Sequence, residues 1–174
     1  MPMLFALATS VGVLAVGATW LFSLDPLASN HLQVWQAFIA WGCHYHSGGK
    51  LTGTRNTVAC MSFGSVVGMA AILLAGQLGS LGQLAAPVAV GLGAAVIVLA
   101  SSIPLLATIP ASVYGFASIA GLVLLSTGMA PASALVPTIL SVVIGAAFGY
   151  VSEVAANVLA KQPAPAPSRR KAVV

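Results

Sequence analysis

The sequence predicts an all-α fold, a polytopic membrane helical bundle of six spans. Hydrophobic residues make up 59% of the 174 positions and charged residues only 5%, whereas a soluble domain carries about 25% charged residues. The apolar runs approach the roughly 20 residues that a helix needs to cross a bilayer, and they lack the alternating pattern of membrane β-barrel strands. We therefore expect the lipid bilayer to surround most of the chain.

Turn-forming and polar residues divide the apolar sequence into the six expected spans. The spans cover residues 3–24, 31–47, 57–77, 84–101, 109–126 and 134–160. They are separated by Asp25-Pro26, Ser47-Gly48-Gly49, Gly76 to Gly82, Ser101 to Pro104 and Thr127 to Pro131. The first run has no basic segment before it and no clear small-residue cleavage site, so we expect a retained span and not a signal peptide.

The basic residues predict how the chain is oriented. Lys50 and Arg55 fall in the second loop, and the other four basic residues fall within positions 161–171. If the N-terminus is cytoplasmic, every Lys and Arg lies on the cytoplasmic side and the outer loops hold only Asp25, as the positive-inside rule expects. The transmembrane domain then covers residues 1–160. We expect the Pro-rich, basic residues 161–174 to be a disordered cytoplasmic anchor with no nucleic-acid role.

Three short segments recur at nearly one separation, which indicates an internal duplication. Residues 65–71 (SVVGMAA) match residues 141–147 (SVVIGAA), residues 38–43 (FIAWGC) match residues 113–118 (VYGFAS), and residues 25–28 (DPLA) match residues 103–106 (IPLL). We therefore expect two three-helix repeats, over about residues 3–77 and 84–160. An odd number of spans inverts the second copy, and transporters built this way bind solutes where short or Gly/Pro-interrupted segments of the halves meet. Here those segments are the second and fifth spans.

The second span and its flanks carry most of the chemically marked side chains. Two of the three tryptophans and all three histidines lie between positions 30 and 49. In a helix, His31, Trp35, Phe38, Gly42 and Tyr45 would recur at three- and four-residue spacing and share one face. We interpret this face, together with Trp41, as one wall of a solute path. Aromatic side chains at this spacing equally suit helix packing or a membrane-interface belt.

The fifth span supplies the opposite wall in this interpretation. Pro110 lacks a backbone donor, so a kink there would free a carbonyl toward a cavity. Ser112, Tyr114 and Ser118 add hydroxyl groups, and Phe116 adds a ring. An aromatic slot with a few hydrogen-bonding groups suits a small, uncharged polar solute. A proline in a membrane helix is also common without any such role.

The titratable residues of the spans are candidates for gating or proton linkage. Glu153 is the only acidic residue within a span, and an intramembrane carboxylate is a functional candidate. It precedes Lys161 by about two helical turns, which favours hydrogen bonding or ion pairing near the interface. His31, His44 and His46 are either protonation gates or solvated helix ends.

Metal and catalytic sites are not expected. His44 and His46 would point to different faces of a helix, and no ligand spacing joins them to Cys43 or Cys60, so we expect no metal and no cofactor. The sequence has no nucleophile elbow, phosphate loop or paired-carboxylate site. An enzyme is therefore not predicted.

Small-residue faces recur on the third and sixth spans. Gly64 with Gly68, and Gly145 with Gly149, allow helix backbones to approach closely inside the chain or between subunits. With these faces on a chain of only 174 residues, we expect a homo-oligomer.

These features together resemble those of a known family. The stretch from Trp35 and Phe38 to Gly42-Cys43, the following Gly48-Gly49, the Pro110 segment and the Gly-rich end at Gly149-Tyr150 resemble the YcdZ-like small inner-membrane proteins of bacteria. The likeness covers about residues 1–160. It implies a bacterial inner-membrane location with both termini cytoplasmic by the charge argument above. The family is named for an unknown function, so it implies no catalytic or binding residue.

The sequence as a whole predicts a channel or transporter for a small, mostly neutral polar solute such as urea or a small amide. The near absence of charge in the spans disfavours a strongly hydrated ion, whose hydration must be replaced by charges or carbonyl rings. The alternative is a non-transporting assembly or regulatory subunit that binds another membrane protein through the glycine faces.

Overall fold

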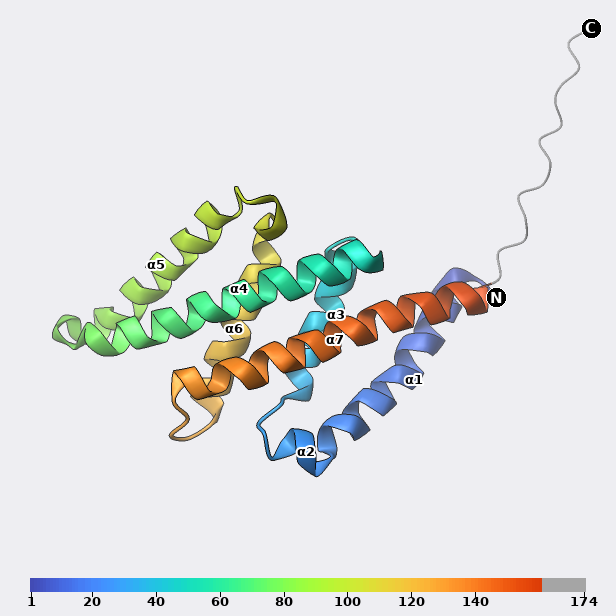
Figure 1. The fold of residues 1–174 in the computed structure, drawn as a ribbon, viewed down its shortest axis with the longest axis horizontal. Helices are drawn as coiled ribbons and strands as arrows, with labels where there is room; N and C mark the ends of the chain where they lie inside the picture. Colours follow the sequence, from blue (N-terminus) through green and yellow to red (C-terminus); the bar gives the residue numbers. More distant parts are fainter. Residues whose placement is uncertain (161–174) are drawn as a thin grey trace, which may run out of the picture.

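The computed structural model describes residues 1–160, and this part of the chain is all-α (Figure 1). The elements in order are α1 (Met3–Ser23), α2 (Asp25–Ala28), α3 (Val34–His46), α4 (Lys50–Gln77), η1 (Gly79–Leu84), α5 (Ala85–Ala100), η2 (Pro104–Leu106), α6 (Ile109–Leu125) and α7 (Pro131–Ala160). The predicted all-α class is confirmed. The predicted tail at 161–174 lies outside the described residues.

Within residues 1–160, four helical segments are long and apolar enough to cross a bilayer. They are α1, α4, η1 with α5, and α7. The other two main helices are shorter, with 13 residues in α3 and 17 in α6. The sequence predicted the second and fifth spans as the short ones; α3 is the shortest of these helices, but α5 without η1 has 16 residues and is as short as α6.

The described residues form seven α-helices, where six were expected. The additional helix is α2, which begins at Asp25 where a turn was expected. Pro26 fits in its first turn because the missing N–H has no intrahelical acceptor there. In addition, α4 begins at Lys50 and not at 57, so that Thr52 to Asn56 are helical and not loop. These polar residues occupy the end of the helix, where a membrane protein meets water.

Two long helices, α4 and α7, cross the middle of the bundle in opposite directions (Figure 1). The short helix α6 packs mainly on α4, and α3 packs mainly on α7. On the outside, α5 covers α4 and α1 covers α7. The central apolar cluster joins α3, α4, α6 and α7, and its buried members are Ala40, Cys43, Cys60, Met61, Ala111 and Val142.

Glycines allow the short and long helices to touch backbone to backbone. A Cβ on Gly64 would lie 1.8 Å from the Ser112 carbonyl oxygen, and a Cβ on Gly145 would lie 2.1 Å from that of Ala37. Any side chain at these positions would force the helices apart. The predicted glycine faces therefore lie at helix contacts inside the chain.

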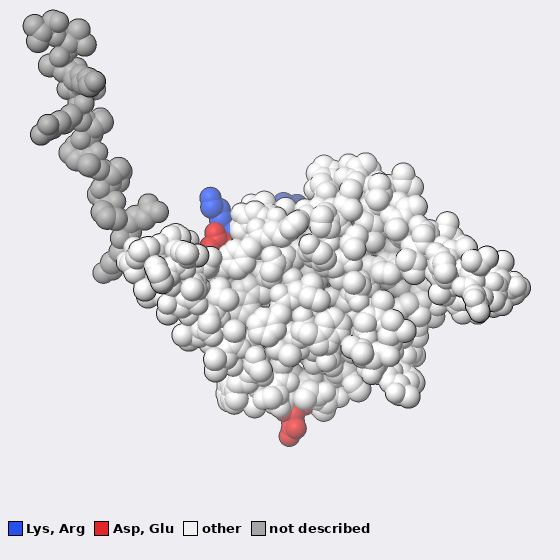
Figure 2. All heavy atoms as spheres, turned by 180° about the vertical axis from the view of Figure 1, so that it is seen from behind, with Lys and Arg blue, Asp and Glu red and all other residues white. Residues whose placement is uncertain are grey.

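The surface of the bundle is apolar over most of its area. Large side chains such as Trp20, Leu99 and Leu124 are 65%, 74% and 84% exposed. Figure 2 shows few charged atoms, with acidic groups at opposite margins of the molecule and one of them beside a basic side chain. An apolar surface of this extent is unfavourable in water and favourable in lipid, which supports a membrane location.

Candidate functional site

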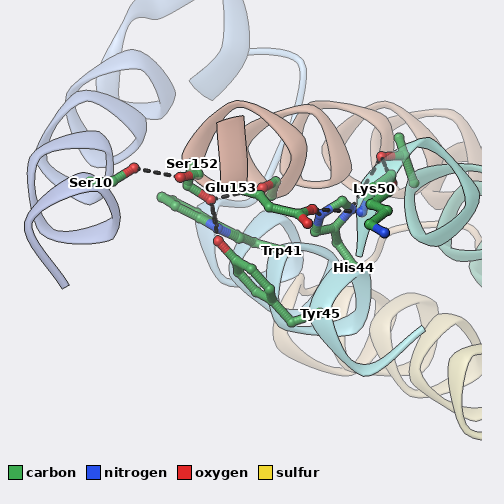
Figure 3. A network of polar contacts seen from close by, with 9 residues as sticks. Ser10, Trp41, His44, Tyr45, Lys50, Ser152 and Glu153 are labelled. Atoms are coloured by element: carbon green, nitrogen blue, oxygen red, sulfur yellow. Dashed lines mark hydrogen bonds and ion pairs between the residues drawn. The ribbon is translucent and has the colours of Figure 1, made fainter. Parts of the chain in front are cut away.

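A polar network joins α3, α4 and α7 at the end of α3 (Figure 3). The His44 side chain is fully buried, and its Nε2 lies 3.0 Å from Oε2 of Glu153. Its Nδ1 lies 3.1 Å from the hydroxyl oxygen of Thr54. The backbone N–H of Lys50 donates to the same Glu153 oxygen at 2.6 Å. One carboxylate therefore connects three helices.

The turn between α3 and α4 places the Lys50 N–H on this carboxylate. Gly48, Gly49 and Lys50 have φ values of 97°, 66° and 55°, in the region that favours glycine. A Cβ on Gly49 would lie 3.0 Å from Oε2 of Glu153, so glycine also makes room for the carboxylate. Since α4 has no side-chain cap of its own, Glu153 supplies a negative charge and an acceptor at the positive end of that helix.

A second group of contacts surrounds the Ser152 hydroxyl, one residue earlier on α7. Trp41 Nε1 donates to it at 2.9 Å, the Tyr45 hydroxyl lies 2.6 Å away, and Ser152 itself donates to the Gly149 carbonyl. Ser10 of α1 donates to the Ser152 carbonyl at 2.7 Å. These contacts tie α1, α3 and α7 together at one end of the bundle (Figure 3).

Further polar side chains lie in the middle of the bundle. Gln36 is fully buried, and its Nε2 donates to the Ser118 carbonyl at 2.9 Å and to the Thr138 hydroxyl at 3.1 Å. Among residues 1–160, the buried side-chain oxygens without a nitrogen or oxygen hydrogen-bond partner are Gln36 Oε1, Thr57 Oγ1, Ser112 Oγ and Ser118 Oγ. Burying such a group without a partner costs about 1–3 kcal/mol. A water molecule or a polar solute beside these atoms would remove that cost.

The predicted aromatic face of α3 mostly faces outward. Phe38 is 39% exposed, and Gly42 is exposed with no atom within 4 Å of a Cβ built on it. Trp35 packs against Gly121 of α6. His31 does not share this face as expected, because α3 begins only at Val34 and His31 lies in the preceding turn.

The buried face of α3 is a different one from the predicted face. It carries Gln36, Ala37, Ala40, Trp41, Cys43 and His44. Of the predicted path residues on α3, only Trp41 lies on it, and its ring stacks between Phe38 and Phe148. Tyr45 is half-buried in the Ser152 network.

Pro110 does not kink a helix, which corrects the prediction of a freed carbonyl. It is the second residue of α6, where a proline is well accommodated. The Thr108 carbonyl there accepts from the N–H groups of Ala111 and Ser112. The proline inside a helix is instead Pro137 of α7.

The remaining predicted residues of the fifth span separate within the bundle. Ser112 and Ser118 are buried among the partnerless polar groups. Tyr114 pairs edge to face with His46 at a centroid distance of 5.9 Å. The Phe116 ring packs over Gly93, and the Phe116 backbone lies against Gly68. The aromatic rings predicted to line the two walls of the path therefore do not gather at one place, although Tyr114 of α6 contacts His46 of α3.

Sequence reasoning missed Gln36, Thr57 and Thr138, which are all fully buried. Their signal in the sequence is a polar residue inside an apolar span, which is costly unless it faces the interior. The predicted site was based mainly on aromatic and titratable residues. Pro137 was likewise overlooked, although with His31 and Ser133 it lines a groove of about 520 Å³ beside the α2–α3 turn.

The comparison with known proteins gives one match. No curated protein and no solved structure matches the chain. A model of the family described as "Protein of unknown function (DUF1097)" matches residues 8–157, which is nearly all of the helical bundle. The resemblance to the YcdZ-like proteins is consistent with this match. The chain therefore belongs to the DUF1097 family of proteins of unknown function.

Proposed function

We propose that this protein forms a passage for a small, neutral polar solute across the bacterial inner membrane. The passage would run through the middle of the bundle, between α3 and α6. The observation that carries the proposal is the set of partnerless, fully buried oxygens on α3, α4 and α6. Polar groups inside a membrane bundle typically face the interior and mark pathways for solutes or ions.

The polar groups fall into two layers around an apolar centre. Thr57 precedes Met61 on α4 by one turn, and Thr138 precedes Val142 on α7 by one turn. Because α4 and α7 run in opposite directions (Figure 1), this spacing places Thr57 and Thr138 on opposite sides of the apolar cluster that contains Met61 and Val142. A dry constriction between two polar layers is a typical closed gate.

The uncharged character of these layers favours a neutral solute. Their members are hydroxyl and carboxamide groups, which replace the hydration of a urea-like or amide-like molecule but not that of an ion. The hydrogen-bonded pair of His44 and Glu153 lies to one side, at the end of α3.

We also propose that the two halves are inverted repeats. The contact of Gly64 with Ser112 has a counterpart in the contact of Gly145 with Ala37. The glycines are 81 residues apart, and the residues that they touch are 75 apart. The contacts between helices correspond in the same way. The packing of α6 against α4 corresponds to that of α3 against α7, and the packing of α5 against α4 corresponds to that of α1 against α7.

A second pair of contacts supports the same correspondence. Gly68 approaches Ile119, and Gly149 approaches His44, again with separations of 81 and 75 residues. These contacts relate α4 to α7 with a separation of 81 residues, whereas the SVV segments suggested a separation of 76. The two alignments differ by five residues. In this proposal the repeat is defined by the glycines that contact the short helices, and not by the similarity of the SVV segments.

The inverted arrangement fits the proposed orientation with both termini cytoplasmic. The Met1 amino group lies 3.3 Å from the Ala160 carbonyl oxygen, so the two ends of the bundle meet. Lys50 adjoins Glu153, two turns before Ala160. The basic residues would then gather on one side of the membrane, as the positive-inside rule expects.

The test is solute flux with the purified chain in liposomes, measured by light scattering after a jump in urea, formamide or glycerol. We expect faster equilibration than in empty liposomes for urea and formamide. Thr57→Val should slow it because the valine has the same shape but no hydroxyl. Thr52→Val is the matched control, because Thr52 is exposed on the same helix. Flux equal to that of empty liposomes for every solute would refute the passage and favour the assembly-subunit alternative.

A further inference from the structure

The polar network at the end of α3 has no counterpart in the other half of the bundle. Applying the separations of 75 and 81 residues to Trp41, His44, Tyr45, Ser152 and Glu153 gives Phe116, Ile119, Ala120, Ala71 and Ile72. Four of these five apolar residues line one cavity of about 220 Å³. The corresponding place in the other half is therefore packed without any polar side chain. Packing alone does not explain why the end of α3 carries a polar network.

We infer that the His44–Glu153 pair is a proton-binding site that opens the α3–α4 end of the bundle when the Glu153 carboxylate itself takes up a proton. The effect on solute flux rests on the proposed passage. The opening of the α3–α4 end does not depend on it. Glu153 is 23% exposed, so a proton from water reaches it, whereas His44 is fully buried.

The network holds a first proton without any movement of its atoms. Thr54 has one hydroxyl hydrogen and two acceptors at 3.1 Å, the His44 Nδ1 and the Lys50 carbonyl. Beside a neutral imidazole, Thr54 donates to Nδ1 and Nε2–H donates to Glu153. Beside an imidazolium, Nδ1–H donates to Thr54, which then donates to the Lys50 carbonyl. In both states Glu153 remains a carboxylate acceptor.

Protonation of Glu153 breaks this arrangement. Its Oε2 accepts from both His44 Nε2 and the Lys50 N–H, and a neutral carboxyl group accepts more weakly than a carboxylate. The buried imidazolium then has no counter-charge, which is strongly unfavourable. The first turn of α4 also loses its negative cap. The α3–α4 turn is thereby released from α7.

Other titratable groups face this end of the bundle but do not form an ion pair with Glu153. On α3 and α4 they are Tyr45, His46, Lys50 and Arg55; on α6, Tyr114; on α7, Tyr150; and at the start of α1, the Met1 amino group. Tyr45 bonds to Ser152, His46 packs against Tyr114, and the Met1 amino group bonds to the Ala160 carbonyl. Among residues 1–160, His44 and Glu153 are the two oppositely chargeable side chains within ion-pair distance, at 3.0 Å.

The test is the distance between spin labels on Thr52→Cys and Asn157→Cys, both exposed positions, in a full-length chain with Cys43→Ala and Cys60→Ala. We expect the distance to lengthen by several ångströms when the pH falls from neutral to below about 4, where a glutamate carboxylate ordinarily takes up a proton. With Glu153→Gln it should be long already at neutral pH and change little. Labels on Gln77→Cys and Ser133→Cys, at the opposite ends of α4 and α7, should show no change.

Solute flux provides the second readout. Flux through the native chain should rise at acidic pH, and Glu153→Gln should abolish this response. Asp25→Asn should retain it, since Asp25 is exposed in α2, far from the network. A native label distance that ignores pH, or a Glu153→Gln chain that keeps the native response, would overturn the inference. A distance that responds to pH without any flux would support the proton site and refute the passage.

Discussion

The contact between Gly64 and α6 allows a quantitative prediction for Gly64→Ala. The added Cβ would lie 1.8 Å from the oxygen, 2.6 Å from the carbon and 2.9 Å from the Cα of Ser112. All three are backbone atoms, so no side-chain rotation relieves the collision. Because Cβ contacts under 3.0 Å are essentially never observed, the oxygen must move by about 1.2 Å. This movement also strains the neighbouring bond from Ser65 to the Gly115 carbonyl.

The expected magnitude follows from two opposing terms. Overpacking costs about 1–3 kcal/mol, and replacing a helical glycine by alanine gains about 1 kcal/mol. Gly64→Ala should therefore lower the free energy of unfolding by up to about 2 kcal/mol. Gly91→Ala is the control, because no atom lies within 4 Å of its Cβ. It should raise the free energy by up to about 1 kcal/mol.

The assay is unfolding of the purified protein in mixed micelles with increasing dodecyl sulfate, followed by circular dichroism. The reasoning is refuted if Gly64→Ala is as stable as Gly91→Ala. Gly145→Ala, whose Cβ would lie 2.1 Å from the Ala37 oxygen, should behave like Gly64→Ala. Opposite behaviour of these two variants would contradict the proposed repeat.

Three further substitutions test the polar groups. Ser152→Ala removes the acceptor of the buried Trp41 Nε1 and should cost about 1–3 kcal/mol, with a change in tryptophan emission. Gly49→Ala places a Cβ at a φ of 66° and 3.0 Å from Glu153, and should cost about 1–2 kcal/mol. Thr57→Val removes a hydroxyl without a partner and should raise the free energy of unfolding by about 1–3 kcal/mol. All three are measured by the same dodecyl sulfate titration.

Each of these substitutions has its own control or contrary outcome. Ser80→Ala and Gly79→Ala change exposed positions near the far end of α4 and should be nearly neutral. If Ser152→Ala is equally neutral, the Trp41 hydrogen bond does not stabilise the fold. A large loss for Thr57→Val would mean that its hydroxyl has a partner in the membrane.

Composition and span length were enough to predict the class of fold and most of its helices. An uninterrupted apolar run in a bilayer must satisfy its own backbone hydrogen bonds, and a helix does so without any partner. The runs ending near Ala100 and Ala160 therefore give α5 and α7 nearly as expected. The start of α4 was missed because Thr52 to Asn56 are polar, and polarity marks a loop and the watery end of a membrane helix alike.

The sequence could not tell which side of α3 is buried. In water, the apolar face of a helix turns inward, but lipid is as apolar as the interior of a protein. The ring of Phe38 is therefore stable outside, while Gln36 and His44 must find partners inside. Those partners, Ser118 and Glu153, are 82 and 109 positions away in the chain. The local spacing of residues in α3 therefore could not predict them.

By itself, then, the sequence determined that the chain is a bundle of apolar helices, because runs without strand-like alternation satisfy their backbone hydrogen bonds in lipid as helices. Only the tertiary structure decided which polar groups meet. In this bundle, close approach of two helices requires a glycine on one of them. Gly64 of α4 lies against the backbone of α6, and Gly145 of α7 lies against the backbone of α3. The burial of Gln36, His44 and Thr57 follows from those approaches and not from the hydrophobic pattern of any single span.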